Sequence, residues 1–138
     1  MAALRLPTAS SDPDHLALVL DAGPEAAPTA RVAARALGRD PQEAADLGLA
    51  VSELVGNAVR HGAAGEDAII LLSVLREGDA FVITASNVPA DGPRPGGGGL
   101  GFEVLRTLGA DVELRREPGR TVASCRLPRD VRAMGLAG

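Results

Sequence analysis

The sequence predicts an α+β fold, a two-layer sandwich in which helices cover one face of a mixed, mostly antiparallel sheet. Strand-like segments come in pairs joined by short turns, one long helix precedes them, and no regular strand–helix–strand alternation is present. With 138 residues, 46% of them hydrophobic, the chain suits one domain with a sizeable core. We expect this domain over residues 15–128, with a flexible leader over 1–14 and a C-terminal tail over 129–138.

The first two elements follow from simple local signals. Residues 15–22 (HLALVLDA) are apolar enough to form a strand, and a connector rich in turn formers follows. A helix then begins near Pro28, since proline is well tolerated in the first turn, and Gly38 is its natural stop.

The long helix has the clearest start signal in the chain. Asp40 can cap the first free N–H groups, Pro41 suits the first helical position, and Glu43 stands at the spacing of a capping box. The helix is predicted to run from Pro41 to about His61, with Gly62 as its terminator. Its buried stripe is expected to comprise Leu47, Val51, Leu54 and Ala58.

The rest of the chain is predicted to form two hairpins separated by a glycine-rich loop and a short helix. The helix, from the segment LGFEVLRTLG, is expected to stop at Gly109. The predicted strands cover residues 68–77, 80–87, 111–117 and 120–128.

Composition excludes several classes of function. A net charge of −4 and only two aromatic residues do not suit a nucleic-acid-binding surface. One cysteine cannot form an internal disulfide, and no apolar run reaches the ~18 residues that span a bilayer. We therefore expect a cytoplasmic protein without membrane or nucleic-acid partners.

Polar residues at the edge of the long helix are the first candidates for chemistry. At 100° per residue, Glu53 and Asn57 fall on one line beside the apolar stripe, which is also the pattern of a solvated helix edge. A carboxylate can accept a proton from an attacking hydroxyl. An amide oxygen can ligate Mg²⁺, which commonly keeps waters and substrate phosphates as its other ligands. The pair suits phosphoryl transfer.

Two later segments add candidate binding groups. The run GGGGLGF leads directly into a helix, so its backbone N–H groups can approach an anion, although glycine runs are more often linkers. Asn87 ends a predicted strand, where it could face a base or simply form a turn. Thr121 lies on the last strand, where a β-branched residue is common.

The order of these motifs resembles that of the GHKL (Bergerat-fold) ATPase superfamily. ELVGNAVRHG resembles its N-box, SNVPADG stands in place of its DxGxG adenine motif, GGGGLGFEVL resembles its second glycine box, and GRTVASCRLP its closing G-x-T strand pair. Within the superfamily the chain is most similar to stand-alone bacterial anti-sigma-factor serine kinases.

This resemblance implies ATP and Mg²⁺ as ligands and assigns roles to individual residues. Glu53 would be the general base, Asn57 the Mg²⁺ ligand, and Arg60 a phosphate contact, with His61 a hydrogen-bonding group at the helix end. Asn87 would read the base, with Thr121 beside it. The phosphates would lie on the backbone amides of Gly97, Gly98, Gly99, Leu100 and Gly101. The implied partners are a sigma factor, an anti-sigma-factor antagonist, or both, and a second copy of the chain.

One departure from the family pattern leaves the function open. The family has aspartate where this chain has Asn87, and Val88 and Pro89 stand where its first glycine belongs. A neutral amide accepts a weaker hydrogen bond than a carboxylate, by about 1–2 kcal/mol. Besides an ATP-dependent serine/threonine kinase, the sequence therefore allows a nucleotide-impaired module that regulates a partner by contact alone. A histidine-kinase catalytic fragment is less favoured, since no dimerisation helix pair precedes the motifs.

Overall fold

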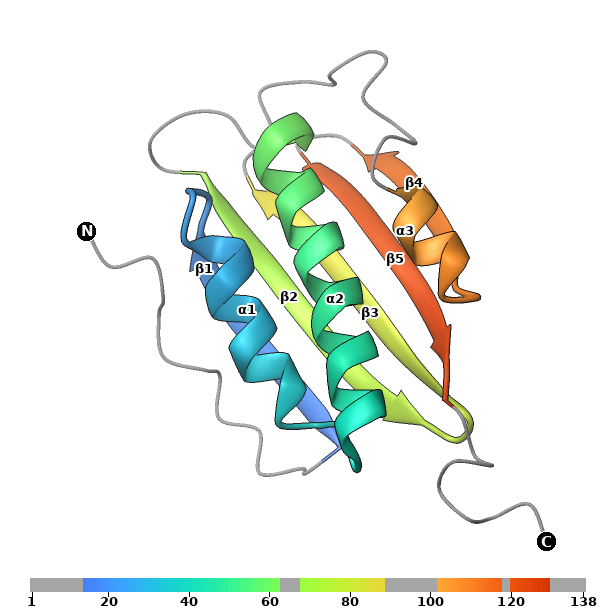
Figure 1. The fold of residues 1–138 in the computed structure, drawn as a ribbon. Helices are drawn as coiled ribbons and strands as arrows, with labels where there is room; N and C mark the ends of the chain where they lie inside the picture. Colours follow the sequence, from blue (N-terminus) through green and yellow to red (C-terminus); the bar gives the residue numbers. More distant parts are fainter. Residues whose placement is uncertain (1–13, 63–67, 89–101, 118–119, 130–138) are drawn as a thin grey trace, which may run out of the picture.

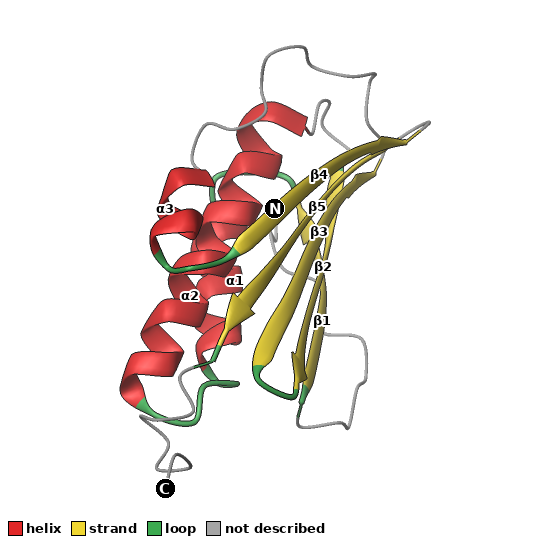
Figure 2. Ribbon diagram, turned by 90° about the vertical axis from the view of Figure 1, so that its right-hand side faces the viewer, coloured by secondary structure: helices red, strands yellow, loops and turns green. Residues whose placement is uncertain are grey.

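The computed structural model describes residues 14–62, 68–88, 102–117 and 120–129, and these form two layers. Helices cover one face of a five-stranded sheet, as Figure 1 shows from the helix side and Figure 2 from the edge. The strands are β1 (His15–Asp21), β2 (Ile69–Glu77), β3 (Ala80–Val88), β4 (Asp111–Glu117) and β5 (Arg120–Pro128).

The sheet has the strand order β1-β2-β3-β5-β4, and all four described pairings are antiparallel. The predicted α+β sandwich is therefore confirmed, and in place of a mixed sheet the described strands form a purely antiparallel one. The turn between β2 and β3 consists of Gly78 and Asp79, the two residues that the predicted strands 68–77 and 80–87 leave between them. Gly78 has φ +60° and Asp79 does not have a positive φ, which is the pattern of a type II′ hairpin turn.

The core lies between the sheet and the helices. Alternate residues of β2 (Ile70, Leu72 and Val74) are buried, and their neighbours are partly exposed. This period of two is the strand geometry itself, because successive side chains point to opposite faces. The inward residues of all the strands meet the apolar faces of the helices in one cluster.

The described helical segments are α1 (Ala26–Arg35), α2 (Pro41–Asn57), η1 (Ala58–Gly62) and α3 (Phe102–Thr107). Helix α1 begins two residues before the predicted start at Pro28. This is physically consistent, because the first-turn N–H groups have no partner within the helix and Pro28 needs none. Gly109 follows α3 with φ +83°, as expected of a helix stop.

The start of α2 agrees with its predicted capping in part. The side chain of Asp40 accepts a hydrogen bond from the Glu43 backbone N–H at 2.8 Å. The side chain of Glu43 accepts a hydrogen bond from the backbone N–H of Arg39 at 2.9 Å, whereas a standard capping box would use the N–H of the next residue, Asp40. All members of the predicted apolar stripe of α2 are buried.

The end of α2 corrects the sequence prediction. Instead of continuing as an α-helix to about His61, the chain changes after Asn57 to the wider π-helical turn η1. The π-helical segment has only five residues, too few for the pattern of apolar residues to distinguish it from one more turn of α-helix. The turn η1 contacts β3 and β5, so this geometry is set together with the packing of the helix end on the sheet.

Candidate functional site

The inward row of β3 ends in a polar residue. Phe81, Ile83 and Ala85 on this face are fully buried, and Asn87, the next residue of the row, is 2% exposed. Within the part of the chain that the structure describes, its Oδ1 accepts no hydrogen bond. A buried acceptor without a partner costs about 1–3 kcal/mol. An unpaired amide at the end of a strand is therefore a good candidate for a ligand contact.

Asn87 is placed beside Thr121 by the register of the sheet. The two residues are Cα partners in the β3–β5 pair, and Ile70 of β2 is the partner of Asn87 on its other side. Thr121 precedes the buried Ala123 on the same face of β5 and is itself half-buried. The register thus brings together two residues that the sequence analysis associated only through the family resemblance.

The last turn of α2 carries the second amide. Asn57 is 6% exposed, and its Nδ2 donates to the backbone carbonyl oxygen of Glu53 at 3.4 Å. This bond holds the amide in one orientation. Because η1 follows directly and contacts β3 and β5, Asn57 lies at the end of the helix layer that covers these strands (Figure 1).

Glu53 and Arg60 lie on either side of Asn57 along the helix. Glu53 is partly exposed, and its carboxylate makes no hydrogen bond or ion pair among the described residues, so it is accessible to a substrate. Arg60 is exposed and folds back over α2. Its Nη1 lies 3.2 Å from the point where a Cβ would stand on Gly56, so the missing side chain leaves room for the guanidinium.

The structure thus places five of the predicted site residues on two neighbouring parts of the fold. Glu53, Asn57 and Arg60 belong to the end of the helix layer, and Asn87 and Thr121 to the adjoining strand ends. The predicted phosphate-binding stretch of Gly97, Gly98, Gly99, Leu100 and Gly101 lies outside the described residues. The side chain of His61 also lies outside what the structure describes, so the roles given to His61 and to the phosphate-binding stretch stay predictions.

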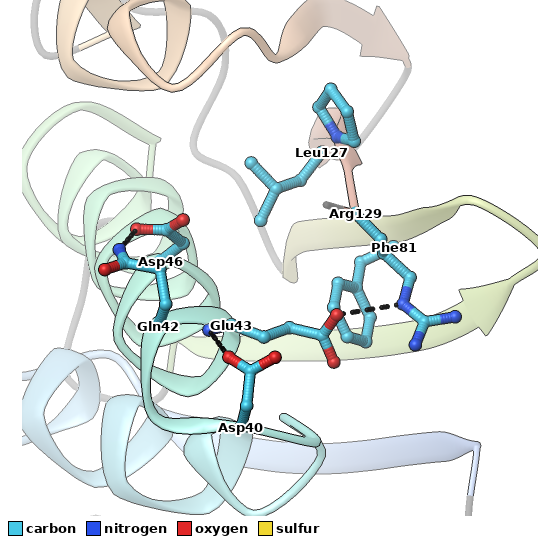
Figure 3. A pocket seen from close by; sticks show the side chains of 8 residues that line it. Asp40, Gln42, Glu43, Asp46, Phe81, Leu127 and Arg129 are labelled. Atoms are coloured by element: carbon cyan, nitrogen blue, oxygen red, sulfur yellow. Dashed lines mark hydrogen bonds and ion pairs between the residues drawn. The ribbon is translucent and has the colours of Figure 1, made fainter. Parts of the chain in front are cut away.

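A second polar site, at the other end of α2, was missed by the sequence analysis (Figure 3). Glu43 and Arg129 form an ion pair at 3.1 Å, and their side chains are only 7% and 8% exposed. The guanidinium of Arg129 also donates to the Gly78 carbonyl at 2.9 Å and lies 5.6 Å from the centre of the Phe81 ring. No local pattern reveals this pair, because its members are 86 residues apart.

This second site borders a small pocket of about 60 Å³. The pocket is separated from Asn57 by about 20 Å along the helix axis, at 1.5 Å per residue from Glu43. It is too small for a nucleotide and is lined by Asp40, Gln42, Glu43, Asp46, Phe81, Leu127, Pro128 and Arg129. We regard it as part of the packing of α2 on the sheet.

The lone cysteine lies in the core rather than in either site. Cys125 is buried on the inward face of β5, and its pKa is raised to about 12, first by burial and then by the negative charge of Asp111. A thiol with so high a pKa is a poor nucleophile at neutral pH.

In the described part of the chain, no helix is long and apolar enough to span a bilayer.

Two comparisons relate the chain to known proteins. The family model of the histidine kinase-like ATPase domain matches residues 10–127. Among solved structures, the chain is similar to the histidine kinase domain of the blue-light activated histidine kinase from Erythrobacter litoralis EL346. That match has 25% sequence identity and a TM-score of 0.45, and it covers 62% of this chain and 44% of the other. No curated protein matches the sequence. Since the family model covers most of the chain, the protein belongs to the histidine kinase-like ATPase domain family.

Proposed function

We propose that the protein is an ATP-binding regulatory kinase that phosphorylates a serine of an anti-sigma-factor antagonist. Membership of an ATPase domain family supports ATP as the ligand. The observation that carries the proposal in this structure is the buried, unpaired Oδ1 of Asn87 beside Thr121, next to the helix end that bears Asn57.

In this proposal the site divides into a base-binding part and a phosphate-binding part. Asn87, with Thr121 beside it, contacts the purine. Arg60 is an exposed residue, and its guanidinium can pair with a phosphate oxygen. The amides of residues 97–101 complete the phosphate contacts. The Oδ1 of Asn57 fits Mg²⁺, a hard cation that takes oxygen ligands, and bound Mg²⁺ would neutralise charge on the phosphates.

The chemical step requires a base near the target hydroxyl. Glu53 takes the serine proton as the serine oxygen forms its bond to the γ-phosphorus of ATP, and ADP leaves with the electrons of the broken P–O bond. The partly exposed carboxylate of Glu53, without a described hydrogen-bond partner, is free to do so. Its place one helical turn from Asn57 keeps the base close to the phosphates.

The partners that this function requires are also part of the proposal. They are a sigma factor, the antagonist protein that carries the serine, or both. A second copy of the chain is proposed as a further partner.

A second candidate function is regulation by contact alone, with little or no nucleotide binding. Asn87 favours it, because a neutral amide replaces the family's aspartate at the base-reading position. The intact pair of Glu53 and Asn57 favours the kinase instead.

Calorimetric titration with ATP and Mg²⁺ separates the two candidates. The kinase requires saturable binding that Asn57→Ala abolishes and that Asp46→Asn, a change on the same edge of α2, leaves intact. No binding at millimolar ATP would leave only the contact module. Proteins that co-purify with the chain from the native cell, incubated with labelled ATP, then show whether the phosphoryl group passes to serine.

A further inference from the structure

Asn87, the residue proposed to contact the base, carries an amide where the family has a carboxylate. A carboxylate only accepts hydrogen bonds, whereas an amide has one acceptor oxygen and two donor N–H groups. We propose that Asn87 allows this site to bind 6-oxopurine nucleoside triphosphates, such as those of hypoxanthine and guanine, as well as ATP. The inference rests on the proposed function, because it concerns the specificity of the same site.

The chemistry of the two kinds of base explains the expectation. Adenine presents a donor at its 6-amino group and an acceptor at N1, and hypoxanthine presents an acceptor at O6 and a donor at N1–H. An amide side chain is complementary to the first pattern in one orientation and to the second after a half-turn about χ2. A carboxylate in the same place would face O6 with a negative charge, and such repulsion is a common source of specificity.

The structure leaves the Asn87 amide free to make this half-turn. Its Oδ1 is buried, and none of the described residues donates to it or otherwise bonds its side chain. Asn57 provides the contrast, since its Nδ2 is bonded to the Glu53 carbonyl. Thr121, the strand partner of Asn87, does not impose a choice either, because a hydroxyl can donate or accept.

Sheet register fixes the position of the amide while its orientation stays open. Asn87 continues the row of Phe81, Ile83 and Ala85, whose side chains are packed in the core, so its Cα cannot shift without disturbing them. Ser86, the residue before it, points to the opposite face of the sheet. The two neighbours are thus a matched pair for testing, since only Asn87 faces the helix end with Asn57.

The test compares ATP and ITP on the full chain by calorimetry in the presence of Mg²⁺. ITP is the sharper probe, because it lacks the 2-amino group of guanine and differs from ATP only along the 6-position edge. The wild-type protein should bind ITP within about tenfold of ATP, since one neutral hydrogen bond replaces another. Asn87→Asp should weaken ITP relative to ATP by roughly a hundredfold, and Ser86→Ala should leave the ratio unchanged.

The outcomes separate this inference from the proposed function. Binding of ATP without ITP by the wild-type protein overturns the inference and leaves the function standing. The absence of binding of either nucleotide, in both wild type and Asn87→Asp, overturns the function and the inference with it. If the buried charge prevents Asn87→Asp from folding, the ratio of ITP affinity to ATP affinity in the wild-type protein alone decides whether the inference holds.

Discussion

Asn87 and Thr121 face each other across the β3–β5 pair, at the end of the sheet that is covered by the last turns of α2. They are 34 residues apart in sequence, and the antiparallel register alone places them side by side. A slip of one residue would turn Asn87 to the opposite face of the sheet, away from Asn57. The proposed nucleotide site therefore depends on the same pairing that builds the core.

Replacing Glu53 tests the proposed general base. Glu53→Gln keeps the shape of the side chain but removes its proton acceptor, so phosphoryl transfer should fall by a factor of about 10²–10⁴. The affinity for ATP should change little, because the base acts on the protein substrate. Transfer and binding are measured separately, and Asp46→Asn on the same helix edge serves as control. Equal losses of affinity and transfer rate would assign Glu53 to nucleotide binding instead.

The ion pair between Glu43 and Arg129 should be the most important polar contact for stability among the described residues. Glu43→Ala removes the carboxylate of a buried ion pair while the Arg129 guanidinium stays in place, so the free energy of unfolding should fall by about 3–5 kcal/mol. Urea denaturation followed by circular dichroism measures this change.

An exposed ion pair from the same region is the matched control. Glu77 and Arg126 approach to 3.3 Å but are 58% and 51% exposed, so Glu77→Ala should cost less than about 1 kcal/mol. Similar losses from Glu43→Ala and Glu77→Ala would contradict the importance of burial here.

Cys125 should make stability fall at alkaline pH. Its pKa is raised to about 12 in the folded protein, so above pH 9 the unfolded chain loses the thiol proton while the folded chain keeps it. The free energy of unfolding should then decline by about 1.4 kcal/mol per pH unit between pH 9 and about 12. Lysine and tyrosine side chains also titrate in this pH range, but the sequence contains neither, so they do not contribute to the change.

Cys125→Ala provides the control for this pH dependence. Urea denaturation at several pH values should show a flatter profile for the variant than for the wild type. A wild-type profile as flat as that of Cys125→Ala would contradict the raised pKa. In the folded wild-type protein at pH 8, the thiol should also react with a disulfide reagent only as fast as the protein unfolds.

A side chain at Gly38 should lower the stability of the protein. A Cβ at this position would lie 2.5 Å from the backbone N and Cα of Ala44, so the loop between α1 and α2 would have to move. Gly38→Ala should therefore lower the free energy of unfolding by about 1–3 kcal/mol. At Gly23 a Cβ meets nothing within 4 Å, so Gly23→Ala should stay within about 0.5 kcal/mol of the wild type. Equal effects of the two substitutions would argue against this packing.

The sequence by itself determined the features that depend on near neighbours along the chain. The hairpin turn at Gly78, the cap of α2 by Asp40 and the stop of α3 at Gly109 all follow from residues a few positions apart. The apolar stripe of α2 and the strand alternation also follow from local periodicity, because a helix and a strand repeat every 3.6 and 2 residues. Most of the fold was therefore predictable.

Tertiary structure decided the features that join distant segments. The register that pairs Asn87 with Thr121, the ion pair of Glu43 with Arg129, and the π-helical turn after Asn57 depend on how helices and strands pack. Such contacts close only when loops of many residues bring their ends together, so no local signal encodes them. The sequence could name the amides and the carboxylate of the candidate site, but only the packed sheet and helix end set them beside one another.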